Sequence, residues 1–456
     1  MRYTLDRKKE LPLLKNPALI IVSSFAILIL VGALLLTLPF MNRTGSFTPF
    51  LDALFTATSA TCVTGLIVYD TYVYFNMAGQ TVIIALIQLG GLGLVTLTSF
   101  FYLLIGKRMN LRTAHLTQES VSSDDKIDTV RLVKMVVFLT ASIEAVGALL
   151  LMCYFVPAYG TYGIFMSVFF AISAYCNAGF DLLGMHGEYS SLISINQNPW
   201  VLTILMLLII SGGLGFIVWQ DLWNFRRRRR LLLHSKIVLV TTGILILSGA
   251  TLFLLTEWSN PATMGNMGVG GKILNAFFQS VTTRTAGFDS IGNGEMTTLS
   301  KFISVIYMFI GAAPGSTGGG IKVTTLVVLL MTVVSVTRGR TDTVIRNRRV
   351  DKLVVYKALS VAFLGMLLVM ITTGVLLATE SSSSEINALF ESTSAFATVG
   401  LSVGISAEAH ELGKIMLIIG MFLGRVGPVS FALSISMAAG AREKKQVMPD
   451  AKIWVG

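Results

Sequence analysis

Long apolar stretches alternate with short polar connections along the whole chain. Eight stretches are long enough to cross about 30 Å of hydrocarbon, which takes about 20 helical residues. Because each of them contains few charged positions, the pattern predicts membrane-spanning helices rather than the core of a soluble domain. The stretches run over residues 17–40, 78–106, 132–156, 200–223, 236–258, 302–336, 353–378 and 414–440.

A shorter apolar segment that ends in glycine follows every odd-numbered stretch. The glycines recur roughly every 110 residues, which indicates an internal repeat. One copy alone reads equally well as a loop whose glycine caps a short helix, but four copies in the same position favour a repeated functional unit. The segments read LFTATSATCVTGL (54–66), VFFAISAYCNAGF (168–180), AFFQSVTTRTAGF (276–288) and LFESTSAFATVGL (389–401).

These segments are too short to cross a membrane, so we expect each to enter from the outer side and turn back. Irregular backbone at that depth is tolerated only inside protein or beside a water-filled cavity. The C-terminal ends of four descending helices carry partial negative charge and favour a cation. Rings of backbone carbonyls replace the water around a dehydrated potassium ion, and glycine supplies the backbone angles that such a turn requires. The repeat therefore predicts an ion filter built from four copies within one chain.

The sequence GAAPGSTGGGIK (311–322) interrupts the apolar stretch 302–336. Each interior glycine destabilises a helix by about 1 kcal/mol and each proline by about 3, so this stretch must be broken. We predict an irregular loop that lies under the filter and acts as a gate. The alternative for Lys322 is that its side chain extends to the cytoplasmic face. Arg425 is a charged residue at membrane depth and is predicted to hydrogen-bond the carbonyls of this loop. The alternative is that Arg425 pairs with Glu144 or with carbonyls at a helix end.

Composition agrees with a membrane protein and constrains its topology. The 456 residues are 54% hydrophobic and 13% charged, which is too apolar for a soluble surface. Most of the 35 lysine and arginine residues lie at the termini and in the connections without a Gly-ended segment, so the positive-inside rule places both termini in the cytoplasm. We therefore attribute the net charge of +11 and the arginine run 226–230 to contact with anionic lipid, and not to nucleic acid.

The connections on the other side are acidic and predict an outer vestibule that concentrates cations. Cys62, Cys153 and Cys176 form no CxxC pair, which argues against a zinc site or a disulfide framework. The four histidines are scattered over loops, and Glu144 is the one carboxylate well inside a stretch. An embedded enzyme would need such groups clustered, so enzymatic activity is disfavoured. The motifs GGLGLV (90–95) and GGLGFIV (212–218) instead predict close helix packing.

The repeated loops and the Gly-rich interruption together resemble the potassium-translocating KtrB-type subunits of the Trk/Ktr/HKT cation transporter superfamily. The likeness covers about residues 17–440, and SVTTRTAGF and GAAPGSTGGGIK are its most specific motifs. It implies an all-α membrane protein with eight transmembrane helices, arranged as four helix–pore loop–helix repeats with four re-entrant pore helices. The implied repeats are 17–110, 111–230, 231–345 and 346–440, between cytoplasmic termini 1–16 and 441–456.

By the same resemblance, the chain takes up potassium across the cytoplasmic membrane as a homodimer on a cytosolic, KtrA-type ring. ATP or ADP would bind that ring, with no cofactor in this chain, and some plant relatives with Ser in place of the first glycine carry sodium. The third copy departs from the pattern, with Val281 where the others have serine. A sodium or mixed-cation transporter of the same fold remains the alternative. The implied filter residues are Val63, Thr64, Gly65, Asn177, Ala178, Gly179, Thr285, Ala286, Gly287, Thr398, Val399 and Gly400, and the implied gate residues are Gly311, Gly315, Ser316, Thr317, Gly318, Gly319, Gly320, Lys322 and Arg425.

Overall fold

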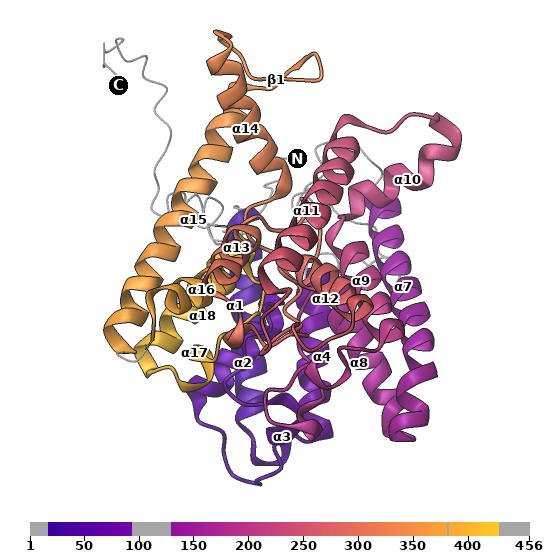
Figure 1. Ribbon diagram of the computed structural model, residues 1–456, viewed down its shortest axis with the longest axis vertical. Coiled ribbons are helices and arrows are strands. Elements are labelled where there is room, and N and C mark those ends of the chain that lie inside the picture. The colour runs from indigo at the N-terminus through magenta and orange to yellow at the C-terminus, as the bar shows by residue number, and fades with distance from the viewer. Residues whose placement is uncertain (1–16, 94–128, 381–382, 428–456) are drawn as a thin grey trace, which may run out of the picture.

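The computed structural model describes residues 17–93, 129–380 and 383–427, and these are predominantly helical (Figure 1). The strands in this part of the chain form one short hairpin, in which β1 (Val344–Ile345) pairs antiparallel with β2 (Arg348–Arg349). The predicted all-helical class is thus confirmed for the described residues.

Four long apolar helices have the length and composition of membrane spans. Each agrees within a few residues with a predicted stretch, because uninterrupted runs of Leu, Ile and Val contain nothing that stops a helix before the polar connection. Their faces toward solvent or lipid are rich in exposed apolar side chains, as a bilayer requires. The helices are α1 (Pro17–Thr37), α7 (Thr129–Tyr159), α11 (Leu233–Glu257) and α15 (Lys352–Thr379).

After each long helix comes a shorter one that ends in the middle of the molecule, in the segments predicted to be re-entrant (Figure 1). These helices are almost wholly buried over their last two turns, so their apolar and small residues pack against neighbouring helices on every side. They are α2 (Phe50–Cys62), α8 (Tyr162–Cys176), α12 (Val269–Thr282) and α16 (Glu385–Ala397).

A further helix follows each Gly-ended segment, and each of these helices ends at a glycine or shortly before one. The predicted continuous span 200–223 is wrong: α9 (Pro199–Gly213) and α10 (Phe216–Arg228) meet at an angle of 93°. The cause is Gly215, whose φ of 86° and ψ of 147° cannot belong to a helix. The other helices are α4 (Met77–Leu92), α13 (Thr298–Phe309), α14 (Val323–Thr337) and α18 (Glu411–Val426).

The break predicted within 302–336 is confirmed, since α13 and α14 are separated by an irregular loop. Helix α4 ends before Gly93, with a φ of 78°, and α18 ends before Gly427, with a φ of 90°. The later parts of the predicted spans 78–106 and 414–440 lie outside the described residues.

Glycines on these second helices allow the short helices to approach closely, as the glycine motifs predicted. A Cβ added to Gly90 would lie 1.9 Å from the carbonyl oxygen of Thr61, and one on Gly212 would lie 1.8 Å from that of Tyr175. On α18, a Cβ added to Gly424 would lie 1.8 Å from the carbonyl oxygen of Phe396. A side chain at any of these positions would displace the last turn of a short helix.

Short elements complete the two ends of the molecule. Figure 1 places α10, α14 and β1 at one end and α3 at the other. The connections at the α3 end contain only single turns of helix, which suits loops that carry the chain over a surface. These turns are η2 (Pro39–Met41), α3 (Thr71–Tyr74), η3 (Gly184–His186), η4 (Ile193–Ile195), η5 (Asn293–Glu295) and α17 (Ile405–Glu408).

Candidate functional site

The four Gly-ended segments meet in a closed ring. A Cβ added to Gly65 would lie 3.2 Å from Cα of Gly179, and one on Gly179 would lie 2.8 Å from Cα of Gly287. A Cβ on Gly287 would lie 3.2 Å from Cα of Gly400, and one on Gly400 would lie 2.8 Å from Cα of Gly65. Each of these Cβ atoms would also come within 2.0–2.8 Å of a carbonyl oxygen of the next segment. Only glycine fits where four backbones approach one another in this way.

Left-handed backbone recurs twice in every segment of the ring. The glycines have φ between 72° and 101°, and the residue two positions earlier has φ between 50° and 70°, whereas the residue between them does not have a positive φ. Alternation of positive and negative φ turns successive N–H groups to one side and successive carbonyls to the other. The left-handed positions before the glycines were not foreseen, because three carry β-branched residues that avoid this region. They are Val63, Asn177, Thr285 and Thr398.

The N–H groups of the first segment point back toward its own short helix. Val63 donates to the carbonyl of Ala60 at 3.2 Å, and Thr64 donates to the carbonyl of Ser59 at 2.8 Å. The N–H of Gly65 donates to the hydroxyl of Ser59 at 3.0 Å. The fourth segment repeats all three bonds, with Ser394 in the place of Ser59. Serine at this position therefore fixes which side of the backbone faces the helix.

The second and third segments are braced by a different bond. The hydroxyl of Ser173 donates to the carbonyl of Phe180 at 2.7 Å. In the third segment Val281 has no hydroxyl, and Thr282 donates instead to the carbonyl of Phe288 at 2.8 Å. The hydroxyl that Val281 lacks is thus supplied one residue later, by Thr282. In this copy the short helix α12 also ends earlier, at Thr282, five residues before the ring glycine instead of three.

A side-chain bond joins the second and third segments directly. The hydroxyl of Thr285 donates to the amide oxygen of Asn177 at 3.2 Å, in the orientation that lets the amide nitrogen donate to the carbonyls of Ile209 and Ala174, both at 3.1 Å. The Thr285 hydroxyl and both polar atoms of the Asn177 amide thereby have partners within the buried centre.

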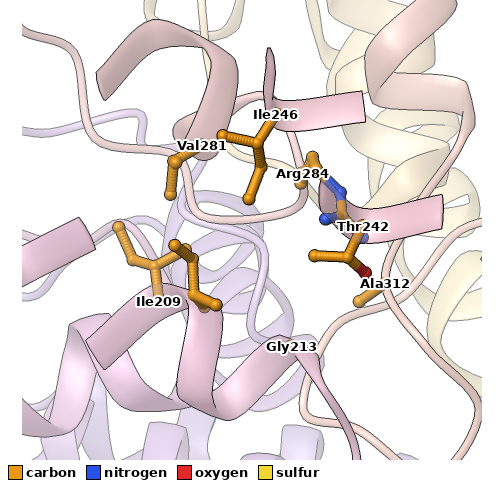
Figure 2. A pocket seen from close by; sticks show the side chains of 8 residues that line it. Ile209, Gly213, Thr242, Ile246, Val281, Arg284 and Ala312 are labelled. Atoms are coloured by element: carbon orange, nitrogen blue, oxygen red, sulfur yellow. The ribbon is translucent and has the colours of Figure 1, made fainter. Parts of the chain in front are cut away.

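The residue three positions before each glycine lies behind the ring. Cys62, Cys176 and Ala397 are fully buried there, so small side chains fill this position in three of the four copies. The third copy has Arg284, which is only 7% exposed and lines a cavity of about 10 Å³ with Thr242 and Ala312 (Figure 2). Neither Nε of Arg284 nor the Thr242 hydroxyl has a hydrogen-bond partner among the described residues. The cavity is at the lower limit for one water molecule.

The irregular loop between α13 and α14 is closed at its base and attached to α9. The N–H of Gly311 donates to the carbonyl of Ile321 at 2.8 Å, and that of Ala313 donates to the carbonyl of Gly213 at 3.1 Å. The hydroxyl of Thr317 donates to the carbonyl of Tyr175, at the end of α8, at 3.2 Å. Within the loop, the hydroxyl of Ser316 donates to the carbonyl of Ala313 at 2.6 Å, and Gly315 and Gly320 have positive φ.

This loop lies directly against the ring. A Cβ on Gly318 would lie 2.1 Å from Oγ1 of Thr285, and one on Gly319 would lie 2.2 Å from Oγ1 of Thr398. Both threonines precede the ring glycines and follow the short helices, so the loop meets the ring on the side where the short helices end. The glycines of the loop are required because side chains there would collide with the ring.

Two cations hold the loop. Arg425 donates through Nη1 to the carbonyl of Thr317 and through Nη2 to the carbonyl of Gly90 at 2.5 Å. Arg425 therefore bonds the carbonyls of the loop, as predicted, and also a carbonyl at the end of α4, which was part of the alternative. Lys322 donates through Nζ to the carbonyl of Gly318 at 2.5 Å. The alternative that Lys322 extends to the cytoplasmic face is therefore wrong: the bare carbonyls of a non-helical loop attract the ammonium group inward.

Acidic residues outside the ring mainly fix loops. Asp289 accepts from the N–H groups of Ile291, Gly292 and Asn293 at 2.8–3.0 Å. Asp181 accepts from the N–H of Leu183 at 3.0 Å. Burial raises the pKa of Asp181 to about 7, although that hydrogen bond opposes the shift. Some of the acidic side chains predicted to line an outer vestibule therefore accept hydrogen bonds from the backbone of their own loops.

A largely buried ion pair joins the first and last copies of the repeat. Nζ of Lys414, on α18, lies 2.6 Å from Oδ1 of Asp52, on α2. The hydroxyl of Tyr69 donates to the other carboxylate oxygen at 2.9 Å. The sequence offered no signal for this contact, because the two charges are far apart in the chain and each reads singly as a loop or helix-end residue.

Comparisons with known proteins agree on one family. Residues 2–445 match the TrkH family, described as cation transport proteins. The chain is 38% identical to the Ktr system potassium uptake protein B of Bacillus subtilis, over 99% of this chain and 100% of that protein. It is 37% identical to the potassium/sodium uptake protein NtpJ of Enterococcus hirae, over 98% and 99%. The structure of the potassium transporter TrkH from Vibrio parahaemolyticus has the same fold, with a TM-score of 0.71, 17% identity and coverage of 94% and 86%.

Proposed function

Because this chain belongs to the TrkH family of cation transport proteins, which are membrane transporters and not enzymes, we propose that it takes up potassium across the cytoplasmic membrane. Its part is that of the membrane subunit of a Ktr-type system. The observation that carries this proposal is the closed ring of four glycine backbones at the ends of four short helices.

In this proposal the chain crosses the membrane eight times, in four repeats of helix, pore helix, filter segment and helix. The repeats are 17–110, 111–230, 231–345 and 346–440, and the termini 1–16 and 441–456 lie in the cytoplasm. The recurring order of long helix, short buried helix and interrupted second helix supports this division. The basic connections support the orientation.

The filter consists of the glycine of each segment and the two residues before it, from Val63 to Gly65 in the first and from Thr398 to Gly400 in the fourth. In the first and fourth segments all three N–H groups are bound to the short helix, so the carbonyls there are free to face the axis of the ring. There they replace the hydration shell of potassium. The C-terminal ends of the short helices add partial negative charge below the ion.

The loop 311–322 is the gate. It abuts Thr285 and Thr398 on the inner side of the ring, so an ion leaving the filter must pass it. Arg425 and Lys322 hold the loop through its carbonyls. Their positive charges also oppose a cation at this level. Movement of the loop would therefore open the path.

We further propose a homodimer that sits on a cytosolic KtrA-type ring. ATP or ADP binds to that partner, and this chain needs no cofactor of its own. The relatives named as Ktr system proteins support a partner subunit. A second candidate function is mixed potassium and sodium transport, which is favoured by the likeness to the potassium/sodium uptake protein of Enterococcus hirae.

Uptake of rubidium into proteoliposomes containing the purified chain tests the proposal. We expect external potassium to compete strongly and sodium weakly. Equal competition by the two ions would favour the mixed-cation function. Complete absence of uptake, in vesicles that contain folded protein with and without the partner ring, would refute transport by this chain.

A further inference from the structure

Helix α10 is fixed rigidly to its neighbours although it turns away from α9 by 93°. The indole Nε1 of Trp219 donates to the carbonyl of Ser211 on α9 at 2.8 Å. At the other end, Asp221 accepts from the N–H of Leu232, just before α11, at 2.8 Å. The bend and the following turn are thus held by specific hydrogen bonds, so α10 moves as a unit with what it contacts.

One side of α10 is buried and the other has the character of a membrane interface. Val218 and Asp221 face inward, whereas Trp223 is 81% exposed and Phe225 is 46% exposed. Tryptophan concentrates where lipid tails meet headgroups. Basic clusters on an amphipathic helix next to a membrane span bind anionic headgroups. The arginines that follow the aromatic residues run from Arg226 to Arg230, and Arg226, Arg229 and Arg230 are exposed.

These features favour a lipid surface over a protein partner. Helix α10 begins where apolar α9 ends, and the right-angled bend directs it along a membrane surface instead of through it. A helix in that position places exposed Trp223 among acyl chains and its arginines among phosphates, which matches interfacial helices. An exposed tryptophan beside a charge run has no such explanation on a purely aqueous face.

The start of α10 is bonded to the loop 311–322. The N–H of Phe216 donates to the carbonyl of Gly315 at 2.9 Å. Gly215 approaches so closely that an added Cβ would lie 2.6 Å from the carbonyl oxygen of Pro314. Val218 belongs to the same buried apolar cluster as Ala313 at the base of the loop. A displacement of α10 must therefore move the loop or break these contacts.

We propose that anionic phospholipid headgroups of the cytoplasmic leaflet bind α10 and thereby hold the loop 311–322 in place. The regulatory part of this proposal rests on the proposed function, because it takes the loop as the gate. Lipid binding then lowers ion flux by opposing movement of α10. The lipid needs only a negative headgroup, since the exposed guanidinium groups recognise phosphate charge.

Rubidium flux in vesicles of two compositions, phosphatidylcholine alone and phosphatidylcholine with phosphatidylglycerol, tests the coupling. Each arginine near an anionic surface contributes about fivefold to binding, so we expect at least about fivefold lower flux in the anionic vesicles. A triple glutamine variant of the arginines at the end of α10 and directly after it should have equal flux in both. The matched control removes three exposed arginines at the α14 and hairpin region and should behave like the unaltered protein. The α10 variant is Arg226→Gln, Arg229→Gln and Arg230→Gln, and the control is Arg338→Gln, Arg340→Gln and Arg348→Gln.

Quenching by brominated lipids measures binding separately from transport. The signal of Trp223 is the difference between the unaltered protein and Trp223→Phe, and brominated phosphatidylglycerol should quench it more than brominated phosphatidylcholine. Gly215→Ala should keep this quenching yet lose the lipid effect on flux, because it disrupts the contact with Pro314. Equal quenching by both lipids, or equal flux of the unaltered protein in both vesicles, would overturn the proposal. The proposal would also be overturned if only a cytosolic partner protein, and no lipid, shielded Trp223 on α10 from quenching. Lipid-specific quenching without ion flux in any vesicle would overturn the proposed function and leave the lipid site standing.

Discussion

Replacement of Gly400 by alanine separates the packing of the ring from the strain of its backbone. The added Cβ would lie 2.0 Å from the carbonyl oxygen of Thr64 and 2.8 Å from Cα of Gly65. Ordinary carbon–oxygen contacts are about 3.3 Å or longer, so the ring must open by about 1 Å. This exceeds the roughly 0.5 Å within which a preorganised binding site keeps its geometry.

Gly404 provides a matched control in the same loop. Its φ of 103° is as unfavourable for alanine as the φ of 92° at Gly400, but an added Cβ meets nothing within 4 Å. Both variants therefore bear the same backbone strain, about 1–2 kcal/mol. Only Gly400→Ala displaces carbonyls of the ring, so a difference between the two variants reports ring packing alone.

We expect Gly400→Ala to lose at least tenfold in preference for potassium over sodium, which corresponds to about 1.4 kcal/mol. Gly404→Ala should keep the original preference. Competition of potassium and sodium against rubidium uptake in proteoliposomes measures both, with equal amounts of folded protein verified by size-exclusion chromatography. Unchanged selectivity in Gly400→Ala, or an equal loss in both variants, would refute the reasoning.

Three further changes test neighbouring features. Arg425→Gln should raise rubidium flux at least severalfold, because the guanidinium bond to the carbonyl of Thr317 holds the loop; lower flux in folded protein would argue against a gate. Ser394→Ala should lower the free energy of unfolding by about 1 kcal/mol by removing the acceptor for the Gly400 N–H, and an unchanged denaturation midpoint would contradict this. The pKa of Asp181 is about 7 against an ordinary 3.8, so the folded state binds the extra proton between about pH 4 and pH 7 and gains stability as pH falls through that window. Asp181→Asn should flatten this part of the profile of melting temperature against pH, and a slope equal to that of the original protein would show that another group is responsible.

Most of the helices could be predicted from the sequence because their signal is local. Uninterrupted apolar runs located α1, α7, α11 and α15, and proline with several glycines located the break before α14. The bend at Gly215 could not be predicted in this way. The glycines of GGLGFIV (212–218) were interpreted as a site of close helix packing within a continuous helix. The conformation of Gly215 is instead set by contact with the distant loop 311–322.

The candidate site was predictable where the repeat made it visible and not elsewhere. The four glycines share a position in every copy, so their convergence followed from comparing segments of one chain. The left-handed backbone at Val63 and Thr398 was hidden, because β-branched residues normally disfavour it and only the tertiary arrangement imposes it. The pair Asp52–Lys414 was hidden as well, since it depends on the first and last copies becoming neighbours.

An anomalous-scattering map of crystals grown with rubidium or caesium would test the central claim most directly. The account predicts peaks on the axis enclosed by Gly65, Gly179, Gly287 and Gly400, with carbonyl oxygens of all four segments around them. A map with the heavy ions bound elsewhere, and with those carbonyls directed away from the axis, would contradict it.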